Sequence, residues 1–167
     1  MTPILVLIGP PGAGKTTIGP LVAALLHTDF RDTDRDIEQV FGKPVAEIFY
    51  DDGEPAFRTA ESEAVEAALN SHPGVLALGG GAVTDPATRA LLKDHQVVYL
   101  SVGLSDAAAR VGLGRDRPVL ALNPRAQLKF LLEQRAPFYA EVATHTVVTD
   151  HRTPADIAAD VAALAQP

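Results

Sequence analysis

Short apolar runs recur along the chain, and they are predicted to form strands buried on both faces of a sheet. The first run, Ile4–Ile8, is continuous, rich in β-branched residues and stops at Gly9. A shorter and more polar strand is expected near Asp29–Asp32. The remaining predicted strands lie at residues 74–78, 96–102 and 145–149.

Between the strands, apolar residues recur at the three- and four-residue spacing of helices. Asp85 and Thr153 each precede a proline, which is typical of an N-cap followed by the first helical residue. Pro137 is expected to end or kink the helix that contains it. The alternation of strands and helices predicts one α/β domain, residues 1–167, with a parallel sheet covered on both faces. The predicted helices lie at 15–27, 34–41, 44–50 and 55–70, and others begin at Asp85–Pro86, Ser105, Asn123–Pro124 and Thr153–Pro154.

Composition narrows the class of protein. The 167 residues suit a single domain, and the absence of cysteine excludes disulfides, thiolate zinc sites and a cysteine nucleophile. A formal net charge of -7 argues against a general nucleic-acid binder. No apolar run approaches the roughly 18 residues that span a bilayer, and no signal peptide is visible. We therefore expect a cytoplasmic protein without membrane or nucleic-acid partners. A monomer is expected because nothing in the sequence requires assembly. The five histidines show no metal-ligand spacing.

A glycine-rich loop carries the clearest chemical signal in the chain. Residues 9–16, GPPGAGKT, fit the pattern G-x-x-x-x-G-K-[ST] between a predicted strand and a predicted helix. The glycines let successive N–H groups point at phosphate oxygens, and the helix N-terminus adds a positive dipole end. Lys15 would bring charge to the β- and γ-phosphates, and Thr16 a hydroxyl to Mg²⁺. The motif predicts a nucleoside triphosphate site that includes Gly12, Ala13, Gly14, Lys15, Thr16 and Thr17.

Two carboxylates follow the second predicted strand. Asp32 and Asp34 are one residue apart, so they can share one face of an extended chain at the sheet edge where ligands bind. One could hold Mg²⁺ through water, and the other could accept a proton from an acceptor hydroxyl. The same acids would serve equally well as an N-cap cluster for the next helix.

Two further segments are compatible with ligand binding or with simple structural roles. Arg58 and Glu61 are helical neighbours. They could form a surface ion pair, or Glu61 could hold the arginine so that it grips a substrate carboxylate. Three consecutive glycines, Gly79–Gly81, end a predicted strand. They could form a tight turn, or they could allow a ligand to approach the main chain closely.

Residues 112–124 show no sustained periodicity and are expected to form a mobile lid between two helices. Arg115, Asp116 and Arg117 lie in this segment, and Arg135 lies on the helix that follows it. An arginine that reaches the transferred phosphate is a recurring device of phosphoryl transfer. Each of these arginines, taken alone, is more typical of a solvated surface charge.

Taken together, these segments resemble the shikimate kinase family over almost the whole chain. The resemblance rests on six blocks in a family-like order: GPPGAGKT at 9–16, DTD at 32–34, FRTAE at 57–61, LGGGAV at 78–83, RPVL at 117–120 and RAPFY at 135–139. It implies a three-layer P-loop kinase fold with five parallel strands in the order 2-3-1-4-5. It also implies Mg²⁺-dependent transfer of the ATP γ-phosphate to the 3-hydroxyl of shikimate, on the route to the aromatic amino acids.

The resemblance also implies roles for individual residues. Asp34, within a substrate-binding region at about 33–61, would bind the reacting hydroxyl and act as base. Arg58 and Arg135 would grip the shikimate carboxylate, while Gly80 would offer a backbone N–H. Other implied roles are Asp32 near Mg²⁺, Arg117 on the phosphate in flight, and Arg110 and Arg152 at the adenine. Arg115 and Asp116 beside Arg117 leave open which arginine reaches the phosphate.

Three rival functions are compatible with the phosphate-binding motif. A gluconate kinase would share the loop but not the other five blocks, and the acceptor segments typical of adenylate kinase are not found. A binding module that has lost turnover would not need Lys15, Asp34 and Arg117 together. Consumption of ATP upon addition of acceptor would distinguish an enzyme from such a module.

Overall fold

A single parallel sheet organises the protein. The computed structural model describes residues 2–111 and 124–165. Its five strands lie in the order β2-β3-β1-β4-β5 and all neighbours are parallel, which confirms the expected order. In chain order the strands are β1 (Leu5–Ile8), β2 (Phe30–Asp32), β3 (Val75–Ala77), β4 (Val97–Ser101) and β5 (His145–Val148).

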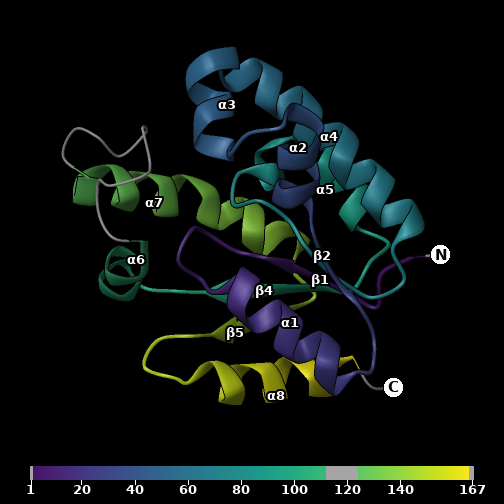
Figure 1. The fold of residues 1–167 in the computed structure, drawn as a ribbon. Coiled ribbons are helices and arrows are strands. Elements are labelled where there is room, and N and C mark those ends of the chain that lie inside the picture. Colours follow the sequence, from purple (N-terminus) through teal and green to yellow (C-terminus); the bar gives the residue numbers. More distant parts are fainter. Residues whose placement is uncertain (1, 112–123, 166–167) are drawn as a thin grey trace.

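Helices cover both faces of this sheet, as Figure 1 shows. On one face lie α1 and α8, and on the other lie α4, α5 and α7. The short helices α2 and α3 pack against α4 and extend the molecule beside the sheet. The helices are α1 (Lys15–Leu25), α2 (Thr33–Phe41), α3 (Val45–Asp52), α4 (Glu54–Ser71), α5 (Pro86–Leu92), α6 (Leu104–Val111), α7 (Pro124–Val142) and α8 (Pro154–Leu164), with a 3₁₀ turn, η1, at Ala82–Thr84.

The central strand explains why the first apolar run is continuous. Leu5 and Leu7 pack toward α1 and α8, whereas Val6 and Ile8 pack toward α4, α5 and α7. All four side chains are buried because helices cover both faces of β1. A third cluster, made by Ile37, Ile48 and Phe57, joins α2 and α3 to α4. Helices α2, α3 and α4 therefore share a core of their own beside the sheet.

Two helix boundaries differ from the sequence prediction, and two predicted N-caps agree with it. Helix α7 continues through Pro137 to Val142, so Pro137 does not end it. Helix α6 begins at Leu104, which places Ser105 inside the helix rather than at its cap. Asp85 and Thr153 are confirmed as N-caps, since their side chains accept hydrogen bonds from Ala87 N and Asp156 N.

The structure tests other sequence predictions only in part. The lid predicted at 112–124 lies outside the described residues except for Pro124, so it stays a prediction. Within the described ranges, no helix combines the length and the apolar character that crossing a membrane requires. Seven residues predicted at strand ends fall just beyond the observed strands: Ile4, Asp29, Gly74, Leu78, Gln96, Val102 and Thr149.

Gly19 on α1 provides a test of how this helix packs against β2. A Cβ at Gly19 would overlap the ring of Phe30 on β2. Replacing a glycine in an open helix by alanine typically stabilises it by about 1 kcal/mol. We expect Gly19→Ala to lower the free energy of unfolding by about 1–3 kcal/mol instead, because the ring must move. Urea denaturation measures the change, and a Phe30→Leu background should restore most of the loss; a stabilised Gly19→Ala single variant would contradict this packing.

Candidate active site

The phosphate-binding loop leads from the buried strand β1 into α1. Gly12 and Gly14 have φ angles of 83° and 97°, in the left-handed region that glycine adopts at little cost. Gly14 is the N-cap of α1, so the N–H groups of the first helical turn face the loop. The loop therefore offers backbone donors and the positive end of a helix to an anion, as its sequence predicts.

Lys15 lies inside this loop. Its ammonium donates to the carbonyl oxygens of Gly9 and, at 3.1 Å, of Pro10. Its charge also opposes the rise that burial causes in the pKa of both Asp32 and Asp34, so these carboxylates lie within its electrostatic reach. The structure thus brings the predicted phosphate-binding lysine and the predicted acidic pair to one edge of the sheet.

The two aspartates have different surroundings. Asp32 is the N-cap of α2, and its Oδ1 accepts a hydrogen bond of 2.9 Å from the Asp34 N–H. The structural interpretation of this acid is therefore confirmed for Asp32. Asp34 Oδ1 is buried and has no hydrogen-bond partner among the described residues. Burial, together with the charges of Asp32 and Glu61, raises the pKa of Asp34 to about 7.

Arg58 is held from several sides rather than solvated. Its Nη1 lies 2.7 Å from Glu61 Oε1, and its Nε lies 3.3 Å from Glu54 Oε1. The guanidinium carbon lies 5.7 Å and 5.4 Å from the ring centres of Phe49 and Phe57. Because the Glu61 side chain is only 5% exposed, this is not an ordinary surface ion pair. The structure shows the arginine held in place by its neighbours, and its role toward a substrate carboxylate stays a prediction.

Arg135 approaches the same group from α7. Its charge opposes the rise that burial causes in the pKa of Glu61, so the two side chains are close. Arg135 Nε is buried without a hydrogen-bond partner among the described residues. Tyr139, one turn further along α7, is fully buried and donates from its hydroxyl to the Gly80 carbonyl at 2.5 Å. Burial also raises the pKa of Tyr139, so this hydroxyl keeps its proton.

Each glycine of the run 79–81 has a different close neighbour. A Cβ on Gly79 would lie 2.5 Å from Asp34 Oδ1 and 2.8 Å from Glu61 Oε2. A Cβ on Gly80 would lie 3.0 Å from Pro11 in the phosphate loop, and one on Gly81 would lie 2.5 Å from the Arg58 nitrogens. The run, which we call the glycine turn, therefore lets the acids, the arginine and the phosphate loop meet at one place.

Three buried polar atoms at this place lack partners within the described part of the chain. They are Asp34 Oδ1, Glu61 Oε2 and Arg135 Nε. Buried polar atoms are normally hydrogen-bonded, and leaving one unpaired costs about 1–3 kcal/mol. Two acceptors and one cationic donor are complementary to a small molecule that carries hydroxyl groups and an anionic group. The arrangement is thus a candidate acceptor site beside a candidate phosphate site.

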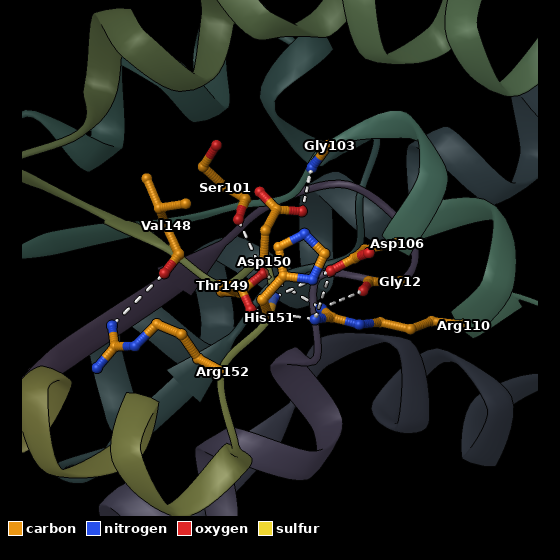
Figure 2. Close-up of polar contacts among 10 residues, drawn as sticks. All are labelled: Gly12, Ser101, Gly103, Asp106, Arg110, Val148, Thr149, Asp150, His151 and Arg152. Atoms are coloured by element: carbon orange, nitrogen blue, oxygen red, sulfur yellow. Dashed lines mark hydrogen bonds and ion pairs between the residues drawn. The ribbon is translucent and has the colours of Figure 1, made fainter.

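Figure 2 shows two further predicted nucleotide residues, Arg110 and Arg152, which have different neighbours. Arg110 Nη1 donates to the Gly12 carbonyl at 3.0 Å, so the structure brings this arginine to the phosphate loop. Arg152 instead contacts the Val148 carbonyl and pairs with Asp160 on α8. Arg115 and Arg117 lie outside the described residues, and their predicted roles stay untested by the structure.

The residues suggested for Mg²⁺ fit only a site that is completed by a ligand. Within the described ranges, no group of three His, Cys, Asp or Glu residues could hold a metal ion. Mg²⁺ commonly binds through one or two protein oxygens and substrate phosphates. The exposed Thr16 hydroxyl and the buried Asp32 carboxylate, both beside Lys15, supply such hard oxygen donors. The donor set therefore fits Mg²⁺ carried in with a nucleotide.

Comparison with known proteins decides the family. A family model described as "Shikimate kinase" matches residues 11–166. The chain belongs to the shikimate kinase family. A relative from Salinispora arenicola named shikimate kinase is 63% identical over 98% of this chain and 98% of its own length. One from Streptomyces coelicolor is 54% identical over 93% of this chain and 91% of its own length.

Solved structures agree with that assignment. The structure of shikimate kinase from Acinetobacter baumannii in complex with shikimate superposes with a TM-score of 0.92, at 37% identity over 98% of this chain and 92% of that one. A gluconokinase from Sinorhizobium meliloti has a TM-score of 0.58 at 19% identity, covering 96% and 90%, and shows a shared fold alone. The family, the P-loop kinase fold and an ATP-dependent kinase activity, all predicted from the sequence, are confirmed.

Sequence reasoning gave no role to two residues whose contacts reach the candidate site. Tyr139 lies within the RAPFY block, and its position one helical turn after Arg135 was the available signal. Thr149 received no role, although it is a buried polar residue directly after β5. Both act through contacts with the main chain of distant segments, which spacing along the sequence does not reveal.

The close contacts of the glycine turn predict that Gly79 and Gly80 differ in their tolerance of a side chain. We expect Gly79→Ala to destabilise the protein by about 1–3 kcal/mol, because its Cβ would displace two buried carboxylates. Gly80→Ala, which meets Pro11 at 3.0 Å, should cost less. Differential scanning calorimetry of the two variants measures the difference, and equal losses would contradict the close approach described for Gly79.

Proposed function

We propose that this protein transfers the γ-phosphate of ATP to the 3-hydroxyl of shikimate, giving shikimate 3-phosphate and ADP. The observation that carries the proposal is the set of unpartnered buried atoms around the glycine turn, Asp34 Oδ1, Glu61 Oε2 and Arg135 Nε. Shikimate is a small anionic polyol, so it offers hydroxyl groups for the acids and a carboxylate for the arginine. The Acinetobacter baumannii relative, whose structure is described as a complex with shikimate, supports the same acceptor.

The nucleotide would occupy the phosphate loop. Backbone N–H groups from Gly12 to Thr17 would surround its phosphates, and Lys15 would turn from the loop carbonyls to the β- and γ-phosphate oxygens. Thr16 and Asp32 would hold the Mg²⁺ that accompanies ATP. When bound, that ion supplies positive charge that bridges the phosphate oxygens.

The acceptor would lie against α4, α7 and the glycine turn. Arg58 and Arg135 would bind the carboxylate, with the Arg58 plane fixed by Glu61 and by the two phenylalanine rings. The Gly80 N–H would contribute a further donor. Asp34 would accept the proton of the 3-hydroxyl as the oxygen attacks the γ-phosphorus and ADP leaves. Catalysis then consists mainly of positioning and of charge stabilisation.

Other parts of the proposal depend on the resemblance rather than on contacts. Arg117, in the predicted lid, would contact the transferred phosphate, while Arg110 and Arg152 would lie at the adenine. A single catalytic domain with its acceptor region at about 33–61, a monomeric state and a cytoplasmic location complete it. The acidic net charge of -7 supports the expectation that nucleic acid is not a partner.

Turnover assays test the proposal directly. ADP release from Mg-ATP should require shikimate, should not respond to gluconate and should be lost in Lys15→Met. ATP binding without shikimate-dependent ADP release would contradict the proposal and favour a binding module instead.

Arg135 allows a matched test of the acceptor site. We expect Arg135→Met to raise the KM for shikimate at least tenfold, because a carboxylate loses one cationic donor. The KM for ATP should stay within about twofold. Arg125→Met, which removes an exposed arginine from the same helix, is the control and should leave both values unchanged. Similar changes in both KM values would argue against a carboxylate-binding role.

The two neighbouring arginines of the predicted lid are also separable. We expect Arg117→Ala to lose far more turnover than Arg115→Ala, because only the first would reach the phosphate in flight. Steady-state kcat values of the two variants provide the comparison, and equal losses would remove the assignment of Arg117.

A further inference from the structure

Thr149, at the end of β5, forms more hydrogen bonds than its position in a turn requires. It is fully buried, and both its N–H and its hydroxyl donate to the Ser101 carbonyl at the end of β4, at 2.9 Å and 2.8 Å. Its hydroxyl and its carbonyl also accept from Arg110 Nη1 and Nη2, each at 3.1 Å. One threonine thus connects two strand ends to one guanidinium group (Figure 2).

The Arg110 guanidinium is fixed in its plane by these contacts. Nη1 is shared between the Thr149 hydroxyl and the Gly12 carbonyl, which lies at 3.0 Å. A guanidinium donates only in its plane, so these acceptors set its orientation and leave its faces available. The Arg110 side chain remains 32% exposed, and its Nη2 lies 3.8 Å from Asp106 Oδ2 on the same helix. Arg110 is therefore oriented by Thr149 while it bonds to the phosphate loop.

Gly12 is the point at which this contact reaches the loop. Its φ of 83° is left-handed, and a Cβ there would lie 3.0 Å from the Ala107 carbonyl oxygen and 3.2 Å from Val111 Cγ1. Helix α6 therefore lies directly against the loop at Gly12. A hydrogen bond from Arg110, one turn of α6 after Ala107, adds to that contact.

Two further bonds hold α6 to the turn after β5. The Gly103 N–H donates to Asp150 Oδ1 at 2.8 Å, and the His151 N–H donates to Asp106 Oδ2 at 3.2 Å. His151 has a φ of 59°, an uncommon conformation for a residue other than glycine. The turn after β5, helix α6 and the phosphate loop thus form one connected unit.

We infer that Thr149 is a positioning residue for the nucleotide: its hydroxyl orients Arg110, and Arg110 in turn holds the Gly12 segment of the phosphate loop. The inference deepens the proposed function, because it concerns the same nucleotide site. Thr149 itself is buried and would touch no ligand. Its effect should therefore appear in nucleotide affinity and not in acceptor affinity.

The hydroxyl can be removed without a change of shape. Thr149→Val keeps the β-branched volume, but its side chain can neither accept from Arg110 Nη1 nor donate to Ser101. The backbone bonds remain: the carbonyl of residue 149 still accepts from Arg110 Nη2, and its N–H still donates to the Ser101 carbonyl. Thr149→Ser keeps the hydroxyl and loses only a methyl group. Thr149→Ala removes the hydroxyl a second way, in case the valine variant folds poorly. Thr88→Val, at a buried threonine on α5, is the matched control.

Isothermal titration with ADP in Mg²⁺ buffer is the primary measurement. We expect Thr149→Val and Thr149→Ala to raise the Kd for ADP about tenfold, the size of one lost hydrogen bond to a charged group. Thr149→Ser and Thr88→Val should stay within about twofold of the parent protein, and so should the KM for shikimate in all four variants. In an Arg110→Met background, Thr149→Val should add little to the loss.

Unchanged ADP binding in the variants that lack the hydroxyl would overturn the inference. A loss in Thr149→Ser equal to that in Thr149→Val, or a full additional loss in the Arg110→Met background, would overturn it as well. ADP titration needs no phosphoryl transfer, so it remains decisive if the parent protein fails to phosphorylate shikimate. That failure would contradict the proposed function alone.

Discussion

The absence of side chains at the end of β3 is the constraint on which the site depends. Three consecutive glycines leave room for the Asp34 and Glu61 carboxylates, for the phosphate loop at Pro11 and for the Arg58 guanidinium. A single Cβ at Gly79 or Gly81 would lie 2.5 Å from one of these charged groups. Backbone entropy lost at three glycines is thus the cost of bringing the candidate phosphate and acceptor sites to one edge of the sheet.

Like charges are concentrated in the acceptor site, and its arginines only partly balance them. Burial raises the pKa of Asp32, Asp34 and Glu61, and the charges of Asp32 and Glu61 raise that of Asp34 further. Arg58 and Arg135 oppose this effect at Glu61, and Lys15 opposes it at both aspartates. A fold that retains such unpaired buried groups sacrifices stability for a preorganised binding site, which is where natural proteins tolerate them.

The phosphate loop is supported from both of its sides. Gly80 lies against Pro11 on the acceptor side, while Arg110 and α6 meet Gly12 on the nucleotide side. Tyr139 extends the acceptor-side support, since it joins α7 to the Gly80 carbonyl. Because these supports come from helices on different parts of the sheet, the relative position of the two binding sites is set by the packed core between them.

The sequence by itself determined the alternation of strands and helices, the phosphate loop and the family. Continuous apolar strands, an N-cap at Asp85 and the spacing of 9–16 are local patterns, and local patterns are readable without coordinates. Tertiary structure alone decided that Glu61 is buried and that Thr149 connects Arg110 to β4. These outcomes depend on contacts between residues far apart in the chain, which composition and spacing do not encode.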